Sequence, residues 1–200
     1  MKRGFIPLLG LVLLIGVSAL ARATDGFQAV TSDGARQLSV ARHPRSIPDV
    51  RLIDQNGHSF SLADYRGKTL LVDFIYTRCP TLCGVLGNDF HRVLAAMPNK
   101  QLDLLSVSFD PANDDHEALK LYGDRFGATA PRWRIAVAAD RRGLDALLRT
   151  FGVVVIPDGI GGFVHDGFIY VVDQHGRFAN IIEPNASAQM IEAAMRPAKP

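Results

Sequence analysis

Residues 70–84 read LLVDFIYTRCPTLCG, and this stretch decides the fold. The near-continuous apolar run over 70–76 is typical of a strand that is buried on both faces of a sheet. A helix is expected directly after it, because Pro80 suits the first helical position and would make Cys79 the capping residue. Cys83 then lies one helical turn further along the same face. The stretch therefore predicts a central strand that delivers two cysteines to the start of a helix.

Strand and helix patterns alternate around this stretch. The apolar spacing predicts strands over 50–53, 59–62, 70–76, 102–109, 133–138, 168–172 and 178–182, and helices over 83–97, 114–126, 141–151 and 186–195. This order predicts a mixed central sheet, parallel in the middle, with helices on both faces. We therefore expect an α/β fold, a thioredoxin-like three-layer sandwich formed by residues 47–200.

The N-terminus has the pattern of an export signal over residues 1–23. A basic start is followed by an apolar run at 4–20, and an A-x-A cleavage signal ends at Ala23. Cleavage after Ala23 is favoured over a membrane anchor, because the run is at the lower limit of length for a spanning helix. The polar segment 24–46 lacks steady periodicity and predicts a flexible arm.

Charge and composition exclude several classes of protein. The chain has 200 residues, 48% of them hydrophobic and 21% charged, which is typical of a folded protein. Removal of the signal would leave 19 basic and 20 acidic residues, so a nucleic-acid partner is not expected. Export places the domain in the oxidising periplasm, soluble after cleavage or anchored to the inner membrane. Two nearby cysteines there form a disulfide unless they are kept reduced or bind a metal.

The spacing of Cys79 and Cys83 separates several chemistries. A thiol beside the positive end of a helix dipole should have a lowered pKa, which suits a redox cysteine. Thioredoxin-type oxidoreductases use C-x-x-C, however, and this motif is C-x-x-x-C. Two thiolates at the wider spacing suit a soft, low-coordinate ion such as Cu(I), whereas zinc requires more ligands. A purely structural disulfide is the remaining alternative, although it would close only a short loop.

The sequence resembles the SCO/SenC family of exported, thioredoxin-fold copper proteins. The likeness runs from about Pro48 to the C-terminus and covers DQNGHSFSLADYRGKTLLVDFIYTRCPTLC, LLSVSFDP and VHDGFIYVVDQHGRF. It implies that Cys79, Cys83 and His165 bind a copper ion, as Cu(I) or Cu(II). It also implies delivery to the dinuclear copper centre of cytochrome c oxidase, whose subunit II would be the receiving partner.

The chain departs from the usual family pattern beside these ligands. The family usually has Pro after the second cysteine, and Gly84 stands here. It usually has Asp before the copper histidine and a hydroxyl residue after it, whereas this chain has Val164 and Asp166. The ligand set is retained, but the residues that orient the imidazole, with Asp166 as a candidate, are expected to differ.

Three other charged residues are candidates for a supporting role at the site. Asp73 lies six residues before Cys79, the offset of the buried Asp that assists proton transfer in thioredoxins. Its alternative role is a core carboxyl satisfied by neighbouring hydrogen bonds. Asp110 ends the next strand, where it could orient Arg78 or the loop, or cap the following helix.

The leading hypothesis is a copper metallochaperone. A thiol–disulfide oxidoreductase that reduces cysteines of a partner is the alternative, with Cys79 as the attacking thiol and Cys83 as the resolving one. A redox or copper sensor is the third hypothesis. Each requires a periplasmic thiol reductant, because copper cannot load until the disulfide is reduced.

Overall fold

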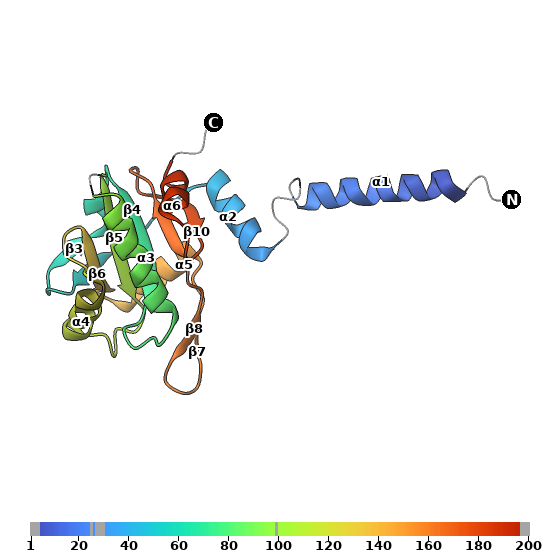
Figure 1. Cartoon of the computed structure of the whole chain (residues 1–200). Helices are drawn as coiled ribbons and strands as arrows, with labels where there is room; N and C mark the ends of the chain where they lie inside the picture. Colours follow the sequence, from blue (N-terminus) through green and yellow to red (C-terminus); the bar gives the residue numbers. More distant parts are fainter. Residues whose placement is uncertain (1–4, 25, 27–30, 99, 197–200) are drawn as a thin grey trace.

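The computed structural model describes residues 5–24, 26, 31–98 and 100–196 (Figure 1). Its helices are α1 (Phe5–Ala23), α2 (Ser32–Arg42), the 3-10 helix η1 (Leu62–Tyr65), α3 (Leu82–Ala96), α4 (His116–Phe126), α5 (Arg141–Phe151) and α6 (Ala188–Ala194). Its strands are β1 (Arg45–Ser46), β2 (Arg51–Asp54), β3 (Ser59–Ser61), β4 (Thr69–Ile75), β5 (Leu102–Ser108), β6 (Trp133–Ala138), β7 (Val155–Pro157), β8 (Phe163–His165), β9 (Ile169–Val172) and β10 (Arg177–Ile182).

Eight strands form the central sheet in the order β1-β10-β9-β4-β5-β6-β2-β3. The pairs β4–β5 and β5–β6 are parallel, and the other pairs are antiparallel. The mixed sheet expected from the sequence is therefore confirmed, with parallel strands at its centre. Strand β4 is buried along almost its whole length, as its apolar run predicts.

Helices cover both faces of this sheet. The two right-handed crossovers β4-α3-β5 and β5-α4-β6 step in the same direction, which places α3 and α4 on one face. On the opposite face, Phe151 of α5 packs against Phe74, Tyr170 and Phe178, with ring centroids 4.9–5.4 Å apart. The arrangement confirms the thioredoxin-like three-layer sandwich (Figure 1).

The segment 24–46 contains more regular structure than the flexible arm expected there. Helix α2 begins after Thr31, whose side chain accepts a hydrogen bond from the Gly34 N–H. Its buried residue Val40 packs into the core, and β1 pairs with β10. Val40 is the single buried residue of this helix. The sequence of the helix therefore shows no steady apolar periodicity that would predict it. Residues 25 and 27–30 of this segment lie outside the described residues.

Helix α1 covers most of the predicted export signal and extends away from the sandwich (Figure 1). Among the described residues, no helix has both the length and the apolar character needed to cross a membrane. Residues 1–4 of the predicted signal lie outside the described residues. Cleavage after Ala23 stays a prediction.

A small antiparallel hairpin, formed by β7 and β8, lies below the main sheet (Figure 1). The glycine-rich stretch 159–162 forms its turn, where Gly159 and Gly161 have φ angles of +79° and +98°. The Asp158 carboxylate accepts hydrogen bonds from the N–H groups of Ile160 and Gly162, which closes the turn. The hairpin matters because β8 carries His165.

Candidate metal centre

The two cysteines lie at the carboxyl end of β4, but the helix begins later than the sequence predicts. Thr81, not Cys79, is the N-cap residue of α3, because the first helical hydrogen bonds run to the Thr81 carbonyl. Cys79 lies in the loop before the helix, and Cys83 lies in its first turn. The Cys79 sulfur still accepts a hydrogen bond from the Cys83 N–H, at 3.3 Å. The expected placement of a thiol at the helix N-terminus is therefore preserved.

The structure brings His165 to the two cysteines from the far side of the domain. Its Nε2 lies 4.0 Å from the Cys83 sulfur, across 82 positions of sequence. The sulfurs of Cys79 and Cys83 and a ring nitrogen of His165 all lie within 4.8 Å of one another. Cys83 is buried, while the other two side chains are partly exposed, so solvent and a partner can reach the cluster.

The imidazole of His165 has a defined orientation. Its Nδ1 lies 2.7 Å from the backbone carbonyl of Asp166, and a carbonyl can only accept a hydrogen bond. Nδ1 is therefore the donor of this hydrogen bond, and Nε2 is the ring nitrogen that faces the sulfurs. The rings of Phe109 and Tyr76 pack edge-on against the imidazole, with centroids 4.9 and 6.0 Å away. Such outer contacts fix the tautomer and the direction of a metal-binding histidine.

The pKa values of the two thiols are shifted in opposite directions. A hydrogen bond from the Cys83 thiol lowers the pKa of Cys79 well below its ordinary value, and contacts with His165 and backbone N–H groups contribute. The same hydrogen bond, together with burial, raises the pKa of Cys83. Cys79 is therefore the thiolate of the pair, and Cys83 holds the shared proton. Both cysteines are free thiols.

Asp73 is completely buried in β4, on the strand that leads to the cysteines. Neither of its carboxylate oxygens has a hydrogen-bond partner within the described part of the chain. Burial raises the pKa of Asp73 to about 7. A hydrogen-bonding interaction with the Ser106 side chain partly offsets this effect of burial. Asp73 is thus a buried carboxyl whose pKa is raised toward neutral pH, and both roles considered for it stay predictions.

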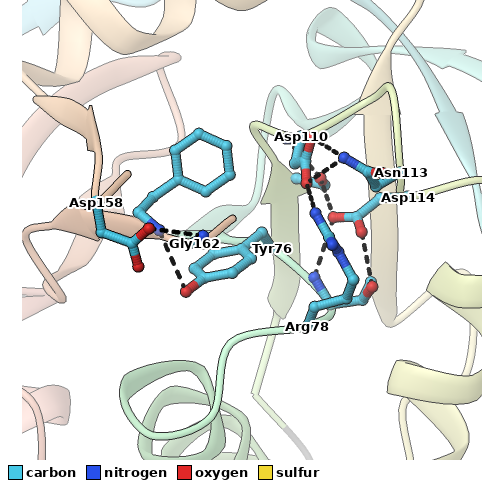
Figure 2. A network of polar contacts seen from close by, with 10 residues as sticks. Tyr76, Arg78, Asp110, Asn113, Asp114, Asp158 and Gly162 are labelled. Atoms are coloured by element: carbon cyan, nitrogen blue, oxygen red, sulfur yellow. Dashed lines mark hydrogen bonds and ion pairs between the residues drawn. The ribbon is translucent and has the colours of Figure 1, made fainter. Parts of the chain in front are cut away.

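Arg78 and Asp110 form an ion pair of 3.0 Å beside the cysteine loop (Figure 2). The Asp110 carboxylate also accepts hydrogen bonds from the Asn113 side chain. Asp115, and not Asp110, caps helix α4. Of the roles considered for Asp110, orientation of Arg78 and its loop is the one that matches these contacts.

Sequence reasoning missed Asp114, a buried carboxylate in the same network (Figure 2). It accepts hydrogen bonds from the N–H and the hydroxyl of Thr77, at 3.0 and 2.6 Å, and from the hydroxyl of Ser108, at 2.5 Å. Thr77 lies two residues before Cys79. Asp114 therefore ties the start of the cysteine loop to the end of β5.

Asp166 contacts His165 through its backbone, whereas its carboxylate faces away toward α2. One carboxylate oxygen lies 2.7 Å from the guanidinium of Arg36 and 3.1 Å from the hydroxyl of Tyr170. Sequence reasoning missed Arg36, because it lies in the segment expected to be a flexible arm. Thr31, followed by Ser32 and Asp33, is the capping signal that could have revealed α2.

The domain has a thioredoxin-like fold, and two thiols and one imidazole lie together at the end of its central strand. These features define a class of proteins with a candidate site for a soft metal ion. Sulfur and imidazole donors suit copper, and the Nε2 of His165 faces the sulfur of Cys83 at 4.0 Å. The family model for SCO1/SenC matches residues 40–198. The chain therefore belongs to the SCO1/SenC family of copper-binding proteins.

Several known proteins are similar to this chain. An SCO2-like protein of Rickettsia conorii is 28% identical over 174 residues, which cover 83% of each chain. The structure of Bradyrhizobium japonicum ScoI with copper bound is 25% identical, with a TM-score of 0.65, and the match covers 75% of this chain and 97% of that one. The thiol–disulfide oxidoreductase ResA of Geobacillus kaustophilus is 23% identical over 190 residues, 95% of this chain and 97% of that protein.

Proposed function

We propose that this protein is an exported copper metallochaperone that binds one copper ion through Cys79, Cys83 and His165 and passes it to another protein. The observation that carries this proposal is the convergence of the three ligand atoms within 4.8 Å. Two sulfurs and one nitrogen form a soft donor set that favours Cu(I) over harder ions. Membership of the SCO1/SenC family supports the choice of copper.

The protonation states of the two cysteines suit the uptake of copper. Cys79 is already the thiolate of the pair, because its pKa lies well below the ordinary value of a thiol. Cys83, whose pKa is raised, must lose its proton when copper binds, so loading releases a proton. The partial exposure of Cys79 and His165 leaves the cluster open to a partner, which can take the ion by exchange of ligands.

Cytochrome c oxidase is the proposed destination of the copper. The SCO family is linked to copper delivery in the assembly of this enzyme. Subunit II, which receives the dinuclear copper centre, is the partner that we propose. The export signal at residues 1–23 would place the protein in the periplasm, where a thiol reductant must keep the two cysteines free.

An anaerobic Cu(I) titration against a competing chelator tests the proposal. Wild-type protein should bind one equivalent, and Cys79→Ser and Cys83→Ser should each lose binding at chelator concentrations that the wild type withstands. Thr81→Ala is a matched control, because Thr81 lies between the cysteines and its side chain makes no cap hydrogen bond. Stoichiometric binding by either serine variant would place the copper site elsewhere.

Thiol–disulfide exchange is a second candidate function, and two observations favour it. The lowered pKa of Cys79 makes this sulfur a nucleophile at neutral pH. The buried carboxyl of Asp73 titrates near pH 7, as a group that transfers protons should. The likeness to a thiol–disulfide oxidoreductase over nearly the whole chain is consistent with this role.

The rate of reaction with oxidised glutathione separates the two functions. His165→Ala should leave this rate within a few-fold of the wild type if Cys79 acts as the attacking thiol, while it should weaken copper retention strongly. An exchange rate no faster than that of a free cysteine would count against an enzymatic role. The measured reduction potential of the cysteine pair then shows whether such a role would be reductive or oxidative.

A further inference from the structure

The side chain of Arg36, in helix α2, is held by several contacts beside the histidine of the candidate metal centre. Its guanidinium donates hydrogen bonds to the Asp166 carboxylate at 2.7 Å and to the backbone carbonyl of Phe151 at 2.5 Å. It also lies over the rings of Phe168 and Tyr170, at 5.6 and 5.7 Å from their centroids. These contacts join α2, the end of α5 and the segment that follows β8.

The guanidinium of Arg36 lies close against the end of α5. Gly152 caps this helix with a φ of +68°, and a Cβ at this position would meet the guanidinium at 3.4 Å, an ordinary van der Waals contact. A planar guanidinium can donate to Asp166 and to the Phe151 carbonyl at once, which a lysine ammonium does with much poorer geometry. Arg36 is therefore held by two hydrogen bonds and two ring contacts, although its side chain is only partly buried.

Two contacts, both made by Asp166, connect Arg36 to His165. The Asp166 carboxylate is held by Arg36 and by the hydroxyl of Tyr170, and its second oxygen is buried without a hydrogen-bond partner within the described part of the chain. The backbone carbonyl of the same residue accepts the hydrogen bond of the His165 Nδ1–H. The position of the Asp166 side chain therefore sets the position of the group that orients the imidazole.

We propose that Arg36 is a positioning residue for His165: by anchoring Asp166, it holds the backbone carbonyl that contacts Nδ1 and so keeps Nε2 directed toward the two cysteines. This inference rests on the proposed copper-binding role of His165. The N-terminal helix α2 thereby becomes part of the metal centre.

The test uses Arg36→Gln and Asp166→Asn in the full chain, with two readouts. Nitrogen-15 NMR of the His165 ring in the reduced, metal-free protein reports the tautomer, and both variants should increase the Nε2–H form. Cu(I) competition should show an affinity loss of about tenfold, the lower end of the range for residues that orient a metal ligand. The double variant should lose no more than the larger single effect, because both changes break one linkage.

Lys68→Gln is the matched control. Lys68 forms an ion pair of 2.8 Å with Asp103 at the opposite end of β4, so its loss removes a similar bond far from the cysteines. This control should leave the His165 tautomer and the copper affinity unchanged. Arg36→Lys should recover part of the affinity lost in Arg36→Gln, because the positive charge is kept.

Several results would overturn the inference. An unchanged tautomer in both Arg36→Gln and Asp166→Asn would do so, as would an equal affinity loss in Lys68→Gln, which would indicate general destabilisation. If Arg36→Gln does not fold, Asp166→Asn decides alone, because it keeps the shape of the side chain. If His165→Ala weakens copper binding while Arg36→Gln does not, the proposed function stands and this inference fails. If the wild type does not bind copper, the proposed function fails while the tautomer still reports on Arg36.

Discussion

The cysteine half of the candidate metal centre is built into the core, whereas the histidine half stands on a hairpin at the periphery. Cys83 is buried on α3, directly after the central strand β4, and the preceding loop is tied to β5 by Asp114. His165 is half-buried on the three-residue strand β8, whose neighbours Val164 and Ile156 are exposed. The same site therefore has one side built on core elements and one side held by a small group of aromatic and polar contacts.

This difference has consequences for affinity and exchange. Groups that are packed into a core keep their geometry. Segments with a low local free energy of unfolding open at little cost. The cysteines are placed to retain copper, and the imidazole is the ligand that can leave most easily. Changes in the cysteine half should therefore affect folding and metal together, and changes in the histidine half should affect the metal alone.

A large effect on stability that does not depend on pH is expected from Asp114→Ala, in the cysteine half. This change leaves three donors, two of Thr77 and one of Ser108, without their acceptor. Buried donors left unpaired should lower the free energy of unfolding by about 3 kcal/mol, measured by urea denaturation. Asp115→Ala is the control, because this exposed N-cap residue should cost only about 1 kcal/mol. Equal losses in the two variants would show that Asp114 does not anchor the loop.

An effect that depends on pH is expected from Asp73→Asn. The folded-state pKa of Asp73, about 7, lies above the unfolded value of about 4, so the folded protein keeps a proton that the unfolded chain releases. Wild-type stability should therefore fall, relative to Asp73→Asn, by up to about 1.4 kcal/mol per pH unit between pH 4 and pH 7. The difference should level off above pH 7, where both states are ionised. A difference that does not change with pH would contradict the raised pKa of this carboxyl.

The smallest effect is expected at the tip of the hairpin, in Asp158→Ala. The variant loses two hydrogen bonds to backbone N–H groups of the turn, but this carboxylate is fully exposed. Amide hydrogen exchange should become faster in β7 and β8, while the urea midpoint of the whole domain stays the same. A clear shift of that midpoint would mean that the hairpin is part of the cooperative core.

The cysteine half could be predicted from the sequence because its signals are local. An apolar run, a proline and two cysteines four residues apart identify the central strand, the turn and the thiols within 15 residues. The exact start of α3 was predicted too early, because Pro80 is compatible with a position before the helix as well as inside it. Such boundaries depend on which carbonyl accepts the first hydrogen bond.

The histidine half could not be predicted in the same way, because its parts meet only in the folded chain. His165 was found through the family resemblance, and the strands β7 and β8 are too short and too exposed to show an alternating pattern. The partners Arg36 and Asp166 are 130 positions apart, and α2 has one buried residue. Sequence patterns indicate burial within one element, and this half of the site is held by polar and aromatic contacts between residues far apart in the chain.

The central claim, that a core-built thiol pair and a hairpin-borne imidazole form one copper site, is tested most directly by Cu(I) affinity. Wild type, His165→Ala and His175→Ala should be titrated anaerobically in the reduced state against the same chelator. His165→Ala should lose more than the roughly 10- to 100-fold that removal of an orienting partner costs, and His175→Ala, which lies in an exposed turn, should match the wild type. Equal affinities of the wild type and His165→Ala would contradict the account.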